Sequence, residues 1–359
     1  MLRKKKKKKK LRFKFKKFTV FVLLLDLLCI GVLVLIHTDK FMNFFITTAM
    51  TTKSHAYLAR TLYDEDTINR ILARNYVEET DEDINLDDIS INGEDMFTKK
   101  YSSKYERELF KKDPGNDVYK IIRLEEKSFK GYVIGVYDPR DVELAVSSRL
   151  GVMGESVNTM VKNNNALVGI NGGGFRDVDG WGNGSFPHGN IIEDGKLVWE
   201  NNRGSGELIG FTKDHKLFLT SETPQQAIAD GMMDAVEFGP NLIVNGKPLT
   251  VHGDGGWGIA PRTVIGQRKD GVVIMLSIEG RLPGYSIGAT MNDLITILKR
   301  YKVYNAANLD GGASATMSVE GELFNRPSAG GEYGGRTVSN AWIVTNKLNK
   351  PAKAPVKNY

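Results

Sequence analysis

The sequence has only one cysteine, Cys29, and five histidines among its 359 residues. Cys29 lies in a long apolar stretch near the N-terminus, so the remainder of the chain has no disulfide, no catalytic thiol and no cysteine-ligated zinc site. The histidines are scattered, which argues against a metal centre built from clustered His and Asp ligands. The fold must therefore be stabilised by its core alone.

Acidic residues are absent from residues 1–17, which contain 12 Lys and Arg. Beyond this tail the chain has 37 basic and 43 acidic residues, so the formal net charge of +6 comes entirely from the tail. A sequence pI near 9.0 normally suggests nucleic acid as a partner. Because the positive charge is confined to one end, we predict no nucleic-acid partner.

Residues 18–36 form an apolar run in which only Thr19 and Asp26 are strongly polar. A helix of this length spans about 28 Å, which is close to the thickness of a bilayer core. The preceding basic tail predicts a cytoplasmic N-terminus and an exported remainder. The alternative is a cleaved signal peptide, but its apolar region is usually shorter, and Ala49 offers only a weak cleavage site. We therefore predict a single-pass cell-membrane protein with a cytoplasmic N-terminus and the rest of the chain outside the cell.

The rest of the chain divides by composition. Residues 37–77 have helical apolar spacing and are predicted to form a membrane-proximal helical segment. Residues 78–95 contain nine acids and no Lys or Arg, so we predict a solvated acidic linker over 78–116. Short β-rich runs with glycine punctuation, interrupted by a few helices, then predict an α+β domain with a mixed β-sheet over 117–346. Residues 347–359 form a tail.

Three apolar runs of the β-rich region end in a polar residue followed by glycine. The pairs are Leu167–Ile170 with Asn171, Val272–Ile278 with Glu279, and Ala306–Leu309 with Asp310. A rigid sheet holds such a polar side chain in place, and the following glycine allows a turn or the close approach of a ligand. One such pair alone favours an ordinary turn. Three in one domain favour an active site.

Two arginines suggest the charge of the substrate. Arg262 precedes a predicted strand, and Arg281 follows Glu279 by two residues. Guanidinium groups bind phosphate or carboxylate through paired hydrogen bonds and keep their charge. Surface salt bridges are the alternative for both arginines.

Four segments of the β-rich region resemble a known family. They are Gly169-Ile170-Asn171-Gly172-Gly173-Gly174-Phe175, Gly239-Pro240-Asn241-Leu242-Ile243-Val244-Asn245-Gly246-Lys247, Ala260-Pro261-Arg262-Thr263-Val264-Ile265-Gly266 and Asn308-Leu309-Asp310-Gly311-Gly312-Ala313-Ser314. In residues, order and spacing they resemble the phosphodiester glycosidase family over residues 118–346. Three positions depart from that pattern: Glu279 replaces the usual Asp, Ala313 replaces a third glycine, and Phe175 lacks a second aromatic neighbour. Residues 41–77 also resemble the membrane-proximal segment of Gram-positive members.

The resemblance implies hydrolysis of a sugar-1-phosphodiester, for example N-acetylglucosamine linked through phosphate, in a cell-envelope or extracellular glycan. Asp310 is then the base or nucleophile, Glu279 its partner acid/base, Arg262 a phosphate ligand and Asn171 a positioning group. The implied substrate-binding residues are Gly172, Gly173, Gly174, Phe175, His188, Arg281, Gly311, Gly312 and Ser314. The substrate partner is a phosphodiester-linked glycan, and no cofactor is required.

Alternatives stay open at several of these positions. A non-catalytic glycan- or phosphate-binding ectodomain for envelope polysaccharide assembly would keep the arginines but would not need two strand-end carboxylates. His188 is as compatible with a structural role as with substrate contact or proton transfer. The run 177–183 faintly resembles a calcium loop, although Trp181 occupies a position that wants an oxygen ligand. Trp181 and Trp257 lie in glycine-rich loops and either stack on a sugar ring or pack locally.

Overall fold

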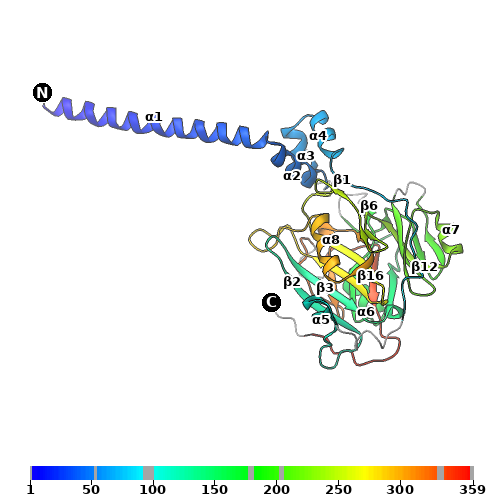
Figure 1. Ribbon diagram of the computed structural model, residues 1–359. Helices are drawn as coiled ribbons and strands as arrows, with labels where there is room; N and C mark the ends of the chain where they lie inside the picture. Colours follow the sequence, from blue (N-terminus) through cyan, green and yellow to red (C-terminus); the bar gives the residue numbers. More distant parts are fainter. Residues whose placement is uncertain are drawn as a thin grey trace. The chain divides into compact units, whose positions relative to one another are not determined.

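The computed structural model describes residues 2–51, 55–91, 101–176, 182–201, 206–329 and 335–355. The chain divides into two compact units, Met1–Arg74 and Asn75–Tyr359 (Figure 1). The calcium-like run falls mostly on residues 177–181, which lie outside the described residues. The predicted stacking role of Trp181 lies outside them too.

The first unit is helical. Its long helix α1 (Leu2–Ile36) contains the apolar stretch Lys16–Ile36, with a mean hydropathy of 3.0 and none of it buried. This stretch is long and apolar enough to cross a membrane, although a signal sequence meets the same criteria. Three short helices follow, namely α2 (Asp39–Met50), α3 (Ala56–Leu62) and α4 (Glu65–Leu72). Ile46, Ala59 and Ile71 are among the residues that form their small apolar core.

A seven-stranded antiparallel sheet forms the centre of the second unit, in the order β14-β13-β18-β16-β17-β3-β2. Its strands are β2 (Tyr119–Glu125), β3 (Lys130–Val136), β13 (Asn241–Val244), β14 (Lys247–Pro248), β16 (Arg262–Arg268), β17 (Val273–Ile278) and β18 (Val303–Leu309). Helices α5 (Lys104–Phe110) and α8 (Met291–Arg300) share an apolar core with it (Figure 1). Thr290 and Asp293 form a capping box at the start of α8, and Leu294 and Leu298 are fully buried.

Two five-stranded sheets share a second core with the central sheet, in which Ile170, Met275 and Trp342 are fully buried. One has the order β20-β19-β5-β21-β4 and the other β11-β10-β12-β8-β9. The first contains β4 (Val142–Val146), β5 (Val168–Asn171), β19 (Met317–Val319), β20 (Glu322–Leu323) and β21 (Asn340–Val344). The second contains β8 (Ile191–Glu193), β9 (Lys196–Trp199), β10 (Glu207–Thr212), β11 (Leu217–Thr220) and β12 (Met232–Phe238). The predicted α+β class is confirmed. Every strand pair among the described residues is antiparallel, so the sheets are not mixed as predicted.

Short elements complete the unit. They are β1 (Tyr76–Val77), β6 (Phe175–Arg176), β7 (Phe186–Pro187), β15 (Val251–His252), α6 (Val157–Asn163), α7 (Pro224–Ala229) and the 3-10 turns Pro139–Asp141 and Gly312–Ser314. Strand β1 pairs antiparallel with β15, and the rings of Tyr76 and His252 stack at 4.5 Å. Next to this pair, Oδ1 of the buried Asn75 accepts the Asp254 N–H at 3.1 Å.

The structure differs from the predicted solvated linker, because residues 78–91 lie on the surface of the second unit. Ile89 is buried there, and the Ser90 N–H donates to the carbonyl of Lys269 at 2.8 Å. The acids of this segment face lysines of the sheet domain, and Glu82 pairs with Lys247 at 2.9 Å. Ion pairs with lysines therefore hold residues 78–91 against the second unit, although the acidic composition of this segment alone predicted a solvated linker.

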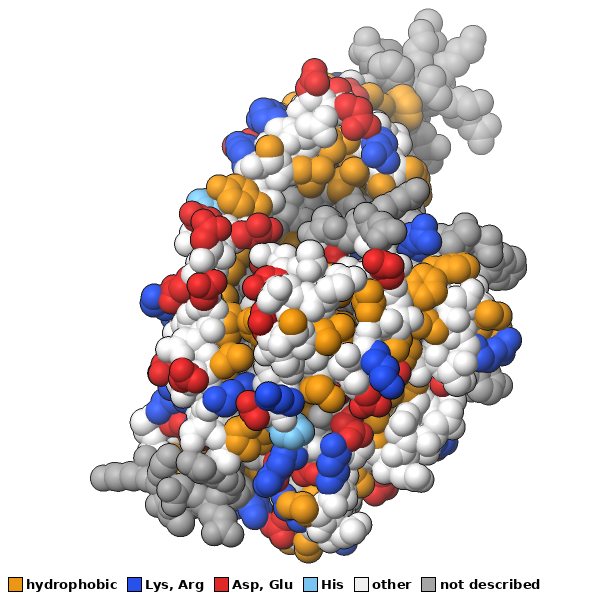
Figure 2. Space-filling model, turned by 90° about the vertical axis from the view of Figure 1, so that its right-hand side faces the viewer, with side chains coloured by type: hydrophobic (Ala, Val, Ile, Leu, Met, Phe, Trp, Pro, Cys, Tyr) orange, Lys and Arg blue, Asp and Glu red, His pale blue; other side chains and the backbone are white. Residues whose placement is uncertain are grey.

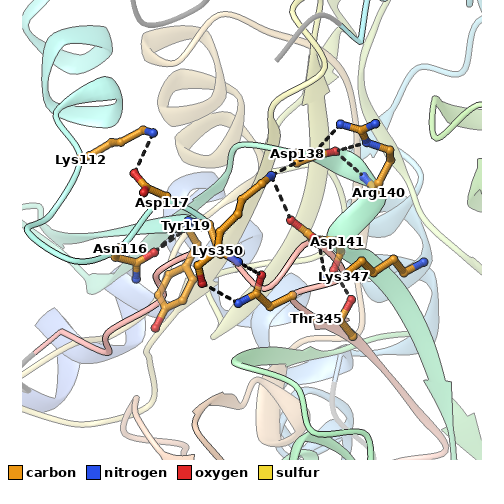
Figure 3. Close-up of polar contacts among 12 residues, drawn as sticks. Lys112, Asn116, Asp117, Tyr119, Asp138, Arg140, Asp141, Thr345, Lys347 and Lys350 are labelled. Atoms are coloured by element: carbon orange, nitrogen blue, oxygen red, sulfur yellow. Dashed lines mark hydrogen bonds and ion pairs between the residues drawn. The ribbon is translucent and has the colours of Figure 1, made fainter. Parts of the chain in front are cut away.

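The C-terminal residues are also attached to the domain, as Figure 3 shows. The Asp117 N–H donates to the carbonyl of Pro351 at 2.7 Å, and Lys350 Nζ lies 3.1 Å from Asp138 Oδ2. Burial alone would raise the pKa of Asp138, but hydrogen bonds from Arg140 and Lys350 lower it to about 2. The part of the predicted tail that the structure describes is therefore ordered against the sheets.

Candidate active site

Two of the three predicted strand ends meet at Asn171, the last residue of β5. The fully buried Asn171 donates from Nδ2 to the carbonyl of Asp310 at 2.6 Å. Its Oδ1 accepts the Thr263 hydroxyl at 2.7 Å and the Thr316 N–H at 3.2 Å. The Asp310 N–H completes the link by donating to the carbonyl of Gly172 at 3.1 Å. Asn171 is thus bonded within the protein and fixes the backbone that presents Asp310.

The glycine run after β5 is shaped by Asn340, which begins β21. The Gly172 N–H donates to the carbonyl of Asn340 at 3.1 Å, and the Gly173 N–H donates to its Oδ1 at 2.7 Å. The Gly172 and Gly173 N–H groups therefore donate within the protein and are not available to a ligand. This differs from the substrate contact predicted for the two residues. A Cβ at Gly174 would lie 2.7 Å from the Phe238 ring, so only glycine fits there without movement.

Asp310 follows the last residue of β18, and the residue is only partly exposed. Protein atoms surround its carboxyl group, and this burial raises the pKa to about 6, while Ser314, Arg336, the Gly311 N–H and His188 act in the opposite direction. A carboxyl group whose pKa is raised toward neutrality has the property expected of a catalytic acid, base or nucleophile. The structure thus brings Asp310, Gly311, Ser314 and His188 together.

Two arginines extend toward Asp310. Arg281 adopts a φ of 56°, in the left-handed region that residues other than glycine rarely occupy, and its guanidinium lies beside Gly312. Burial lowers the pKa of Arg281, and the charge of Asp310 opposes that change. Arg336 stacks on the Phe175 ring, with 4.6 Å between its guanidinium carbon and the ring centre. Sequence reasoning missed Arg336, whose only local signal was its place after a glycine-rich stretch of the sequence and before β21.

Arg262 is almost fully buried, at 3% exposure, and supports the loop that precedes β16. Its Nη2 donates to the carbonyls of Trp257 at 2.6 Å and Gly258 at 2.7 Å, and its Nε donates to that of Ala289 at 3.1 Å. Burial and the nearby charge of Arg281 lower its pKa to about 10. No carboxylate forms an ion pair with Arg262 in the part of the chain that the structure describes, so its charge adds to the positive potential around Arg281.

Aromatic and imidazole groups border the same region. The rings of Phe238 and Trp257 lie 5.9 Å apart in a tilted arrangement, and Phe238 is next to Gly174. The exposed His188 is anchored by its own N–H, which donates to the carbonyl of Gly174 at 2.9 Å. A sugar ring beside Asp310 would therefore find both an aromatic surface and a titratable group nearby.

Glu279 occupies a different environment from Asp310. It is 1% exposed, its Oε1 accepts the Arg326 N–H at 2.6 Å, and its Oε2 has no hydrogen-bond partner among the residues that the structure describes. Burial and then the charge of Glu279 raise the pKa of Tyr132 to about 12. Among the described residues no hydrogen bond or ion pair joins Glu279 to Asp310. This placement favours a role for Glu279 in positioning the segment at Arg326, over its predicted role as the acid/base partner of Asp310.

Glu279→Gln is therefore expected to keep kcat within about tenfold of the wild-type value, because Gln Oε1 still accepts the Arg326 N–H. Glu279→Ala removes that acceptor and should lower the free energy of unfolding by about 1 kcal/mol. Steady-state kinetics and thermal unfolding measure the two effects. A loss of more than about a hundredfold in the Gln variant, with an unchanged Tm, would instead restore Glu279 as a catalytic partner.

Within the described ranges, no group of three or more His, Cys, Asp or Glu side chains is arranged to hold a metal ion. The chemistry available at this site is that of one titratable carboxyl group surrounded by guanidinium and imidazole groups. Such a site attracts an anion and can act on an atom bonded to it.

The family model described as phosphodiester glycosidase matches residues 164–345, just over half of the chain. The chain belongs to the phosphodiester glycosidase family. The resemblance carried by the four sequence motifs is thereby confirmed.

Curated relatives match over a limited part of their length. The chain is 30% identical to the uncharacterized prophage-derived protein YomE of Bacillus subtilis, over 49% of this chain and 28% of that protein. It is 25% identical to N-acetylglucosamine-1-phosphodiester alpha-N-acetylglucosaminidase of Mus musculus, over 39% of this chain and 30% of the mouse protein. The chain thus spans less than a third of the length of these two relatives.

A solved structure shows the same fold. The zebrafish N-acetylglucosamine-1-phosphodiester alpha-N-acetylglucosaminidase catalytic domain, auto-inhibited by its pro-peptide, matches with a TM-score of 0.53 and 24% identity. The match covers 66% of this chain and 85% of the zebrafish chain.

Proposed function

We propose that this chain is an exported, membrane-attached hydrolase that cleaves a sugar-1-phosphodiester, such as N-acetylglucosamine linked through phosphate, in a cell-envelope or extracellular glycan. The observation that carries the proposal is the placement of Asp310, whose pKa is raised to about 6, beside the charges of Arg281 and Arg336. One carboxyl group within an excess of cations suits a substrate that joins a phosphate to the reacting carbon. The printed name of the mouse relative describes such a substrate.

In the proposed reaction the bond between the anomeric carbon and the phosphate oxygen breaks, and water supplies the new oxygen on that carbon. The leaving group is a phosphate monoester with a second pKa of about 6, so it needs little protonation. Arg281 and Arg336 would stabilise its charge, with Arg262 behind them. Ionised Asp310 would act on water as a base or on the anomeric carbon as a nucleophile.

The proposed location rests on the first unit. The apolar stretch Lys16–Ile36 follows a tail rich in Lys and Arg, and such tails stay on the cytoplasmic side. An uncleaved α1 would then hold the second unit outside the cell as a single-pass protein.

The test uses the full chain in detergent with a sugar-1-phosphodiester in isotopically labelled water, with and without a chelator. Label in the released sugar, unaffected by the chelator, is the expected result. Label in the phosphate would show P–O cleavage and contradict the proposal. Saturable binding without turnover over a range of sugars would favour a non-catalytic glycan- or phosphate-binding ectodomain.

The charge of Arg336 should set the acid limb of the pH profile. Ionised Asp310 is the reactive form, so kcat/KM should fall as the pH drops through about 6. Because Arg336 lowers the pKa of Asp310, Arg336→Gln should move this limb to higher pH by about one unit. Arg336→Lys keeps the charge and should leave the limb in place. An unshifted limb in the Gln variant would show that Asp310 does not control it.

A further inference from the structure

An acidic cavity of about 660 Å³ lies in the second unit and shares no lining residue with the site around Asp310. The segment 80–87 forms one wall, and residues of β10, β11 and β13 contribute to the others. Figure 2 faces the side of the molecule where Figure 1 places α7 and β12, and it shows acidic and basic side chains interspersed over that face. The acids that line the cavity are Asp81, Glu82, Asp83, Asp87, Glu207, Glu222 and Asp230, and no Lys, Arg or His is among the described lining residues.

These carboxylates are poorly compensated within the protein. Of the seven, only Glu82 forms an ion pair in the described part of the chain, with Lys247 at 2.9 Å. Burial and the charge of Glu79 raise the pKa of Glu207 to about 7. Burial and then the neighbouring Asp230 raise the pKa of Glu222. Like charges that hinder each other's ionisation favour a bound cation, which would relieve the repulsion.

Two buried acceptors in the cavity lining lack donors. Among the described residues, Oδ1 of Asn241, a residue that is only 6% exposed, has no hydrogen-bond partner, and neither does the buried Oε2 of Glu207. Buried polar atoms in folded proteins are nearly always hydrogen-bonded, so each such exception needs an explanation. The Asn241 oxygen can only accept, and so can Glu207 when it is ionised, so a ligand that satisfies both must carry N–H or O–H groups.

The size and ligand geometry indicate which cation fits. The cavity is far larger than the space that a bare ion fills, and the described residues contain no cluster of three or more metal-binding side chains. An ammonium group offers three donors, no acceptor and one positive charge, which matches both the orphan acceptors and the unpaired carboxylates. We propose that this cavity binds a small molecule with several primary ammonium groups, either a free polyamine or an amino sugar.

The experiment is calorimetric titration of the full chain in detergent at about pH 8, where Glu207 is mostly ionised. Spermidine and a glucosamine tetramer are the two amine probes, and Ca²⁺ is the competing metal. Binding of either amine supports the proposal and identifies the source of the ammonium groups. Binding of Ca²⁺ alone, or of no probe, overturns it.

Variants locate the site. Glu207→Gln and, separately, Glu222→Gln should each weaken amine binding at least about tenfold, because each removes a charge-assisted hydrogen bond. Glu222 is exposed, so its variant is informative even if Glu207→Gln alters folding. Glu322→Gln removes a surface charge from β20 and should change the affinity less than about twofold. Equal affinity in all three variants would exclude the cavity.

The proposal is independent of hydrolysis. Asp310→Asn should bind the amine as the wild type does, so a failed activity assay would not affect it. Conversely, an enzyme that hydrolyses its substrate but binds no amine would contradict only the cavity proposal.

Discussion

Asp310→Asn should reduce kcat for a sugar-1-phosphodiester by roughly a thousandfold or more, because the amide can neither accept the proton of water nor attack carbon. Asn preserves the shape of the side chain. The backbone contacts of Asp310 to Asn171 and Gly172 involve only its carbonyl and N–H, and both remain. Steady-state kinetics on the full chain measure the loss. Turnover within about tenfold of the wild-type value would remove Asp310 from the chemistry.

The same variant should be at least as stable as the wild type at neutral pH. The pKa of Asp310 rises from 3.8 to about 6 on folding, so the folded state binds the proton more tightly than the unfolded state. Stability from this group is therefore lost as the pH rises from about 4 to about 6. Asn cannot ionise and avoids this loss, so its Tm should match the wild type near pH 4 and equal or exceed it above pH 6.

Asp214→Asn is the matched control, because it makes the same chemical change at an exposed position. It should alter neither kcat nor the pH dependence of Tm. A lower Tm for Asp310→Asn at neutral pH would show that the ionised carboxylate stabilises the fold, contrary to the burial argument.

Asn171→Leu should lower both stability and activity. Leucine has a similar volume but leaves the buried Thr263 hydroxyl and Thr316 N–H without their acceptor. The free energy of unfolding should fall by roughly 3 kcal/mol. For a unit of this size the Tm would fall by about 6–12 °C. The lost bond to the Asp310 carbonyl should also displace the carboxyl group, and a shift of about 1 Å can reduce kcat by about a hundredfold.

Thr263→Val separates these effects. It removes one hydrogen bond to Asn171 and leaves the bond from Asn171 to Asp310 intact. A stability loss of about 1 kcal/mol with nearly unchanged kcat is expected. If both variants lose kcat equally, Asn171 acts through general stability and does not position Asp310.

Local patterns predicted those parts of the site that depend on neighbouring residues. The Asn245-Gly246 pair, a dipeptide typical of tight hairpin turns, has φ values of 51° and 77° and joins β13 to β14. The runs that end at Asn171 and Asp310 form the adjacent strand ends. These features follow from apolar runs, turn residues and glycine placement, which can be read within a few positions.

The remaining parts depend on contacts between distant segments. Asn340 and Arg336 join the site from a strand and loop more than a hundred residues after β5, with no motif of their own. Glu279 follows its strand as Asp310 does, yet its carboxylate is buried beside tyrosines. The direction of a side chain beyond the end of a strand is set by tertiary packing, which the local sequence does not record.

The contact at Asn75 has a mechanical consequence. Asn75 is the first residue of the second unit, and it is hydrogen-bonded to the turn at Asp254, shortly before the loop whose carbonyls hold Arg262. In the proposed membrane-attached enzyme, tension along the chain from α1 would therefore load β1 and its partner β15 before any other strand of the second unit. That force would act first on the support of Arg262, so the proposed turnover would be sensitive to strain between the membrane and the proposed glycan substrate.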